Sequence, residues 1–371
     1  MKVLIAGDFC PRDRVAQTLE LEDYASVLSE IHEETAHADF SIVNFECPVT
    51  KGTEEAITKC GPRLRCTTKG VKAIKWAGFD CVTLANNHFL DYGKEGVENT
   101  LQACRKYGLD IVGGGLDFQE ASKVLYKKIN GETLAIINCC EHEFSIATET
   151  TAGSNPLNPI QQYYSIKEAR DKADYVLVII HGGHEMWQLP SPRMQETYRF
   201  FIDAGADAVV NHHQHCYSGY EYYNGKPIVY GLGNFCFDKQ GYLPELWCYG
   251  YMVNINFSDE IKIELYPYEQ CRKEPKVMLL SDRKGFEERI KELNSIISSP
   301  QKLQEETYAY YSRNKKNIHM AFEPYRGRIL NKLYLLGLLP SFLSNNKKKK
   351  LLNLLQCESH RDKVLHNLNT D

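Results

Sequence analysis

Residues 175–185 read YVLVIIHGGHE, an apolar run that ends directly in two histidines and a glutamate. A short run rich in β-branched residues indicates a strand buried on both faces, as in a parallel sheet covered by helices. Similar runs recur at residues 3–6, 40–43, 81–84, 134–137, 208–210 and 228–230. Several of them alternate with helical patterns at residues 71–77, 96–107 and 193–204. This alternation predicts a layered α/β domain over residues 1–280.

The segment after residue 222 has a different pattern, in which strands are joined by short turns. Asn224-Gly225 predicts a hairpin turn, because both residue types tolerate a positive φ. A doubly wound sheet made only of parallel strands is therefore excluded.

Composition narrows the class of protein. The 371 residues are 43% hydrophobic and 25% charged, which is typical of a globular protein and excludes a disordered or coiled-coil chain. The net charge of -4 provides no field that would attract nucleic acid, so no nucleic-acid partner is expected. The thirteen cysteines are scattered and include no Cys-x-x-Cys pair, which predicts reduced thiols.

The first eight residues run straight into a strand pattern, without the basic and apolar regions of an export signal. The longest apolar candidate for a membrane span, residues 329–343, is short and is interrupted by Asn331, Lys332 and Pro340. A soluble cytoplasmic protein is predicted, with peripheral contact at the inner face of the membrane left open.

Residues 281–371 are predicted to form a basic helical C-terminal region, with helical patterns at 286–297, 302–312 and 325–338. Residues 313–363 hold twelve Lys or Arg against three Asp or Glu, which leaves -13 on the rest of the chain. One interpretation is a helical appendage with a solvated basic face. The other is docking on an anionic membrane, a polymer or a synthase, because residues 335–342 supply apolar side chains beside the four lysines at 347–350.

Polar side chains follow five of the predicted strands. Because the carboxyl ends of parallel strands meet at one edge of a sheet, these side chains are expected to converge. Carboxylate, amide and imidazole groups without thiolate suit manganese, iron or zinc. His213 and His215 would share one side of an extended segment. The residues are Asp8, Asn44 and Glu46, Asn86 to His88 with Asp91, His181 to Glu185, and Asn211 to His215.

The motifs in this order resemble those of the capsule synthesis protein CapA family, the poly-γ-glutamate capsule proteins, whose fold is similar to the calcineurin-like metallophosphoesterases. The resemblance covers roughly residues 1–270. It implies a four-layer αββα sandwich of metallophosphoesterase type, with a helical C-terminal appendage outside it. The motifs are Gly7-Asp8, Asn44-Phe45-Glu46-Cys47-Pro48, Asn87-His88-x-x-Asp91-x-Gly93, His181-x-Gly183-x-Glu185, His212-His213-x-His215 and Gly233-Asn234-Phe235-x-Phe237-Asp238.

The resemblance also implies roles for particular residues. His88 would be the general acid, with Asp91 orienting its imidazole and Glu185 as a further catalytic residue. The classical enzymes have a histidine where this chain has Cys10, so a single divalent ion is expected beside the alternative of two. Substrate-binding roles fall on His184, His212 and Asn234, although Gly233-Asn234 also favours a turn. The implied metal ligands are Asp8, Glu46, Asn87, His181, His213 and His215.

Two functions from different classes remain open. The first is a metal-dependent hydrolase acting on a phosphoester or an amide-linked polymer, in the biosynthesis of poly-γ-glutamate or a capsule polysaccharide. The second is a non-catalytic accessory or polymer-binding subunit of a polymer synthase. Either would have an anionic polymer or a phosphorylated small molecule as its partner. A nuclease is disfavoured by the acidic main domain.

Overall fold

The computed structural model describes residues 1–239, 241 and 243–369. The chain forms two compact units, Met1–Leu303 and Gln304–Asp371. The first unit carries both large sheets, and the second is helical.

The first sheet has eight strands in the order β16-β15-β14-β1-β2-β3-β4, with β13 also paired to β1. Strands β1 to β4 are parallel, and β14 to β16 extend the sheet in antiparallel fashion. This mixture confirms that the sheet is not doubly wound throughout. The strands are β1 Lys2–Cys10, β2 Phe40–Phe45, β3 Cys81–Thr83, β4 Asp110–Val112, β13 Asn234–Phe237, β14 Tyr249–Asn256, β15 Lys262–Gln270 and β16 Val277–Leu279.

The second sheet has six strands in the order β11-β12-β10-β9-β7-β6. The predicted hairpin turn lies between β11 and β12, where Asn224 and Gly225 have φ of 51° and 76°. A separate short pair joins β5, Gly114–Gly115, to β8, Gly153–Ser154. The strands of the large sheet are β6 Leu125–Ile129, β7 Glu132–Cys140, β9 Tyr175–His181, β10 Ala208–His212, β11 Tyr220–Tyr223 and β12 Lys226–Val229.

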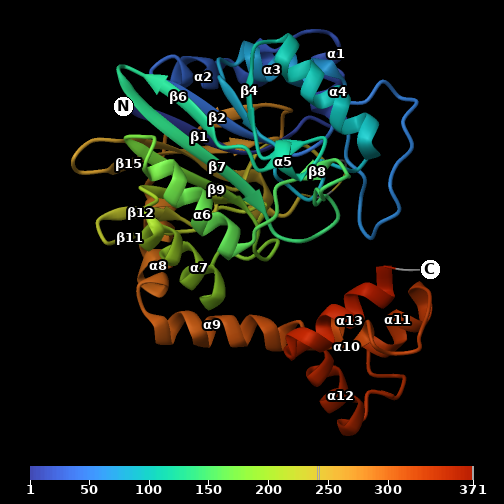
Figure 1. The fold of residues 1–371 in the computed structure, drawn as a ribbon. Coiled ribbons are helices and arrows are strands. Elements are labelled where there is room, and N and C mark those ends of the chain that lie inside the picture. Colours follow the sequence, from blue (N-terminus) through green and yellow to red (C-terminus); the bar gives the residue numbers. More distant parts are fainter. Residues whose placement is uncertain (240, 242, 370–371) are drawn as a thin grey trace. The chain divides into compact units, whose positions relative to one another are not determined.

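Helices cover the outer faces of the two sheets, as Figure 1 shows. Helices α1 to α4 lie over the first sheet, and α6 and α7 contact the strands of the second. The predicted αββα sandwich and its helical C-terminal appendage are thereby confirmed. The elements are α1 Asp13–Glu20, α2 Ala25–Thr35, α3 Thr68–Trp76, α4 Gly93–Lys106, α5 Phe118–Ala121, α6 Pro159–Arg170, α7 Pro192–Ala204 and the 3₁₀ helix η1 Glu245–Cys248.

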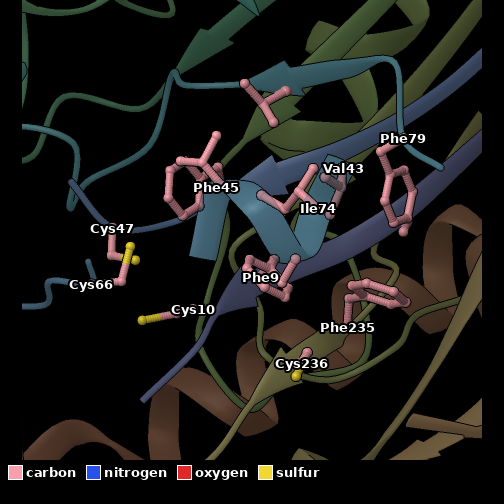
Figure 2. Close-up of a cluster of buried hydrophobic side chains, with 14 of the residues drawn as sticks. Phe9, Cys10, Val43, Phe45, Cys47, Cys66, Ile74, Phe79, Phe235 and Cys236 are labelled. Atoms are coloured by element: carbon pink, nitrogen blue, oxygen red, sulfur yellow. The ribbon is translucent and has the colours of Figure 1, made fainter. Parts of the chain in front are cut away.

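Aromatic and sulfur-containing side chains contribute to the core between the first sheet and helices α1 to α4 (Figure 2). Phe79 and Phe235 meet edge to face with ring centroids 5.5 Å apart, a favourable aromatic geometry. Cys10, where the classical motif has histidine, is buried in this apolar cluster. All thirteen cysteines are free in the structure, and their reduced state stays a prediction.

Helix α8, Lys284–Ile297, contacts β11. Its residues Leu293 and Ile297 are fully buried. The first compact unit therefore includes α8 and ends at Leu303, within α9, Pro300–Arg313. The boundary predicted after residue 280 remains a hypothesis about which part of the chain folds alone.

The second unit contains short helices. The helix expected over residues 325–338 is wrong in length, because glycines with φ of 83° and 80° at Gly327 and Gly337 flank a shorter helix. Among the described residues, no helix is both long enough and apolar enough to cross a membrane. The helices are α10 Lys315–Met320, α11 Arg328–Leu335, α12 Asn345–Gln356 and α13 Glu358–Asn369.

Candidate metal site

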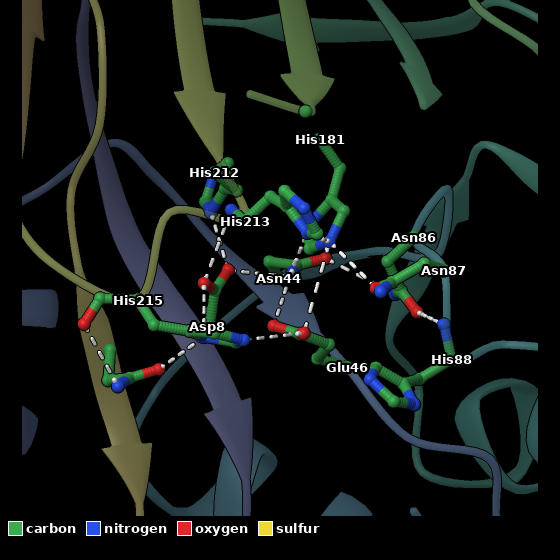
Figure 3. A network of polar contacts seen from close by, with 12 residues as sticks. Asp8, Asn44, Glu46, Asn86, Asn87, His88, His181, His212, His213 and His215 are labelled. Carbon is green, nitrogen blue, oxygen red and sulfur yellow. Dashed lines mark hydrogen bonds and ion pairs between the residues drawn. The ribbon is translucent and has the colours of Figure 1, made fainter. Parts of the chain in front are cut away.

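The carboxyl ends of strands from both sheets bring carboxylates and imidazoles together (Figure 3). Potential ligand atoms of Asp8, Glu46 and His181 all lie within 4.8 Å of one another. Asp8 follows Gly7, where the register between β1 and β2 shifts. A Cβ at Gly7 would lie 1.9 Å from the carbonyl oxygen of Gly233. Glycine is thus required for β1 to pass this loop and aim Asp8 into the site.

The other predicted ligands surround this group. His181 Nε2 lies 3.1 Å from Asn87 Oδ1 and 3.1 Å from His213 Nδ1. His215 Nε2 lies 3.7 Å from Glu46 Oε1. The structure therefore brings together all six residues that the sequence predicts as metal ligands.

The backbone that presents His213 and His215 differs from the prediction. Strand β10 ends at His212. His213 and His215 then have φ of 89° and 54°, a left-handed region that is sparsely populated by residues other than glycine. The expectation of an extended segment is wrong, and a strained turn brings both imidazoles toward the site instead.

Burial and mutual proximity set the pKa values of the two carboxylates. Burial raises the pKa of Asp8, but the hydrogen bond with His212 and the charges of the nearby imidazoles outweigh it, so the pKa is lowered overall. Burial and the neighbouring Asp8 raise the pKa of Glu46 well above its usual value. Glu46 Oε1 has no hydrogen-bond partner among the described residues. A divalent cation fits this site, because it would satisfy that oxygen and offset two adjacent buried carboxylates.

Burial disfavours the protonated form of two of the predicted ligands, His181 and His213, and metal coordination requires the neutral form. It lowers the pKa of His181 well below its usual value, with His213 adding to the effect. The pKa of His213 is lowered in the same way by burial and by His215.

His88 and Asp91 form a pair beside the cluster. His88 Nδ1 lies 2.6 Å from Asp91 Oδ2, and Asp91 also accepts a hydrogen bond from the backbone N–H of Leu64 at 2.6 Å. Burial lowers the pKa of His88, although Asp91 opposes this shift. With Nδ1 engaged, Nε2 is the nitrogen left for a substrate.

A cavity of about 640 Å³ opens onto the cluster. Its wall includes Asn87, His88, His215 and the exposed Glu185, together with Trp247. We name this space the site cavity.

The three predicted substrate-binding residues lie elsewhere. His212 is 2% exposed, with Nδ1 3.3 Å from Asp8 Oδ1. Asn234 is fully buried, and its Oδ1 lies 2.9 Å from His215 Nδ1. His184 is half-buried with its ring 5.7 Å from that of Trp187, and it is absent from the wall of the site cavity. His212 and Asn234 therefore contact predicted metal ligands and do not line the site cavity.

Three further residues belong to the site. Asn44 Nδ2 donates to Asp8 Oδ1 at 2.8 Å, and Asn86 Oδ1 accepts from the backbone N–H of His88 at 3.1 Å. Both were among the strand-end residues expected to converge, although neither was assigned a role there. Lys59, whose side chain is buried, forms an ion pair with Asp91, and its Nζ lies 3.2 Å from His88 Nδ1. It comes from an irregular loop, where no sequence pattern marks it.

The fold and this donor set define an α/β sandwich whose strand ends can hold a divalent cation. A model of the family "Bacterial capsule synthesis protein PGA_cap" matches residues 2–239. The chain belongs to this family, which confirms the resemblance seen in its motifs.

Curated relatives carry related names. The chain is 36% identical over 211 residues to "Capsule biosynthesis protein CapA" of Bacillus anthracis, covering 55% of this chain and 51% of that protein. It is 35% identical over 238 residues to "PGA biosynthesis protein CapA" of Bacillus subtilis, covering 63% and 62%. A Mycobacterium tuberculosis relative, 29% identical over 56% of this chain and 58% of its own, is named "Probable polyglutamine synthesis accessory protein". The matches span about half to three fifths of these proteins.

Solved structures give weaker likenesses. A hypothetical protein from Thermus thermophilus aligns with TM-score 0.45 and 15% identity, over 72% of this chain and 99% of its own. A 5'-nucleotidase precursor from the same organism aligns with TM-score 0.43 and 12% identity, over 76% and 54%. Likenesses at this level bear on neither activity nor substrate.

Proposed function

We propose that this chain is a metal-dependent hydrolase acting in capsule polymer biosynthesis, on an amide-linked polymer such as poly-γ-glutamate or on a phosphoester. The observation that carries the proposal is the group Asp8, Glu46 and His181, with donor atoms within 4.8 Å of one another beside the site cavity. A divalent cation held there would supply Lewis acidity toward an ester, amide or phosphoryl oxygen.

The chain's own residues would position the substrate and move the proton. His88 faces the site cavity, and Asp91 fixes the orientation of its ring, so Nε2 can hold a proton for the leaving group. Glu185 is exposed on the same wall and can orient a polar substrate group. We assign His212 and Asn234 a supporting role, because each is buried against a predicted ligand.

The second candidate is an accessory subunit of a polymer synthase that binds polymer without cleaving it. The M. tuberculosis relative is named as an accessory protein, which favours this candidate. Fold and family membership are compatible with both, because function depends on the site and not on the fold.

The two candidates are separated by measuring metal and turnover on the purified full chain. We expect stoichiometric Mn²⁺, Fe²⁺ or Zn²⁺ by elemental analysis, and hydrolysis of a γ-linked glutamate oligomer or a nitrophenyl phosphodiester. Asp8→Asn should abolish both metal binding and hydrolysis. Asp259→Asn is the matched control, because Asp259 is exposed and lies outside the site.

Each result has a defined meaning. A stoichiometric metal with no hydrolysis of either substrate, together with polymer binding, would favour the accessory subunit. No metal in the wild type after reconstitution would refute the metal site itself.

A further inference from the structure

A second cavity, of about 540 Å³, adjoins the site cavity, and Arg12 lines both. Its wall is formed by α1, by the start of α3 and by the two ends of the loop between Thr50 and Cys66. The middle of that loop, including Lys59, lines the site cavity. We name this second space the α1–α3 cavity.

Cationic side chains outnumber acidic ones in the α1–α3 cavity. The cations are Arg12, Lys51, Arg65 and Lys69, and the acids are Asp13 and Glu20. The two acids are already engaged, since Asp13 pairs with Arg12 at 3.0 Å and Glu20 accepts from Thr67 Oγ1 at 2.6 Å. Lys69 pairs with Glu22.

Lys51 and Arg65 are the unpaired cations. Neither has a carboxylate within ion-pair distance among the residues that the structure describes. The Arg65 guanidinium lies 5.5 Å from the ring centroid of Tyr92, a cation–π contact that leaves its charge uncompensated. Two positive charges therefore face this recess without a counter-ion from the protein.

The backbone holds the two cations on neighbouring parallel segments, with Arg65 one residue before and Lys51 two residues beyond the bridge between Cys66 and Val49. Thr50 N donates to Cys66 O at 2.9 Å, and Cys66 N donates to Pro48 O at 3.1 Å. Lys51 and Arg65 stand next to this pairing, at the base of the loop. Glu54 accepts from the backbone N–H of Lys51 at 2.8 Å, which fixes the start of the loop as well. These bonds fix the backbone from which the two exposed side chains extend.

We infer that the α1–α3 cavity is a second anion subsite, which holds an acidic unit of a polycarboxylate chain while another unit of the same chain occupies the site cavity. This inference rests on the proposed function for its substrate class. Guanidinium and ammonium groups bind carboxylates by charge-assisted hydrogen bonds. The open recess and its shared wall suit successive carboxylates of a chain better than one compact phosphate. Two subsites on one ligand would raise affinity through effective concentration.

The test measures binding of a labelled γ-linked glutamate decamer to the full, Mn²⁺-loaded chain by fluorescence anisotropy at low salt. The test variant is Lys51→Ala with Arg65→Ala. The matched control is Lys94→Ala with Lys262→Ala, which removes the same charge from exposed side chains outside both cavities. We expect about a tenfold loss of decamer affinity in the test variant and little change in the control, with equal metal content in all three.

Several outcomes would overturn the subsite. An equal loss in the control would show a general field effect, and unchanged affinity in the test variant would show no contact. A wild type that binds the decamer no better than free glutamate would also refute it. If inorganic polyphosphate binds and loses affinity in the test variant while the decamer does not, the recess takes phosphate chains instead.

Failure of the hydrolase proposal is distinguishable from failure of the subsite. The binding assay requires no turnover, so an inert protein whose double variant loses decamer affinity would retain the subsite and lose the hydrolase. Turnover by the wild type, together with unchanged decamer affinity in the double variant, would retain the hydrolase and refute the subsite.

Discussion

At the scale of single residues, Asn87 and His88 are adjacent in the chain but have different contacts in the site. Asn87 Oδ1 lies 3.1 Å from His181 Nε2, whereas the neighbouring His88 is held by Asp91. One residue is therefore placed to coordinate a cation, and the next is placed to exchange a proton with a substrate.

The first prediction separates these two roles. His88→Ala should retain its metal and lose turnover by roughly 10²–10⁴-fold, the usual contribution of a positioned acid or base. His213→Ala should lose both metal and turnover, because His213 Nδ1 lies 3.1 Å from His181 Nε2 within the predicted ligand group. Metal analysis beside steady-state kinetics provides the readout. Equal metal loss in both variants would show that His88 is a ligand.

The second prediction concerns Lys59, whose ammonium is buried against Asp91. Lys59→Met should lower the free energy of unfolding by about 3 kcal/mol, because it leaves a buried carboxylate without its cation. Urea denaturation measures this change. Lys94→Met is the control, since Lys94 is exposed and its pair with Glu98 at 3.7 Å should contribute at most about 0.5 kcal/mol. Equal losses of stability in Lys59→Met and Lys94→Met would show that the ion pair between Lys59 and Asp91 contributes little to folding.

The third prediction follows from the raised pKa of Glu46. In the metal-free protein, Glu46 stabilises the fold in its protonated form. This contribution to stability is fully present below the unfolded pKa of about 4.5, and it is lost as the pH rises through the raised folded pKa. A bound cation would hold the ionised carboxylate without that loss. Removing metal with EDTA should therefore lower Tm more at pH 8 than at pH 6, by differential scanning calorimetry. An equal or smaller drop at pH 8 would contradict a metal at Glu46.

The convergence of the six candidate ligands could be predicted from the sequence, because strand ends converge wherever a parallel sheet forms. The burial of His212 and Asn234 could not, since motif position does not reveal whether a side chain faces a cavity or the interior. Lys59 was missed altogether. Its role depends on a long-range contact to Asp91 from a loop without periodicity, and local sequence patterns carry no such information.

At the scale of elements, the close approach of β1 to the loop at Gly233 fixes the position of Asp8 in the site. Asp8 N donates to Gly233 O at 3.1 Å, which ties the end of β1 to that loop. Asp8 is therefore placed by a backbone contact that only a glycine at position 7 permits.

The fourth prediction tests this close approach. Gly7→Ala should destabilise the protein by about 1–3 kcal/mol and weaken metal binding, because its Cβ would meet Gly233 O at 1.9 Å and force the strand away. Thermal unfolding and metal titration provide the two measurements. Gly285→Ala, in α8 with no atom near the added Cβ, should be neutral or slightly stabilising. Unchanged metal affinity in Gly7→Ala would refute the positioning argument.

The strands of the first unit could be predicted because each is a compact apolar run, and all seven predicted runs overlap strands of the structure. The helices of the second unit were harder to predict from the sequence. Helix α12 begins with six polar residues, Asn345 to Lys350, and its sequence has no clear apolar stripe. Its Ser344 cap, which accepts from Lys347 N at 3.3 Å, is the local signal that marks where this helix begins.

At the scale of the whole molecule, charge and apolar exposure are divided between the two units. Of the twenty-two large apolar side chains exposed among the described residues, fourteen lie in Gln304–Asp371. The same unit carries the four lysines at 347–350, and its exposed leucines at 352, 354 and 355 follow them in α12. Basic charge beside exposed leucines is typical of a surface that binds anionic membranes.

The last prediction compares two truncations of the chain. Removal of residues 304–371 should leave a folded, metal-binding first unit that no longer sediments with phosphatidylserine vesicles. Removal of residues 281–371 should also destabilise that unit, because it strips away α8, whose Ile290, Leu293 and Ile297 are buried and would each contribute about 1.5–3 kcal/mol. Replacing Lys347 to Lys350 by Gln in the full chain should weaken vesicle binding without changing Tm. Undiminished vesicle binding after the shorter truncation would contradict membrane docking, and equal stability of the two truncated forms would move the folding boundary back to residue 280.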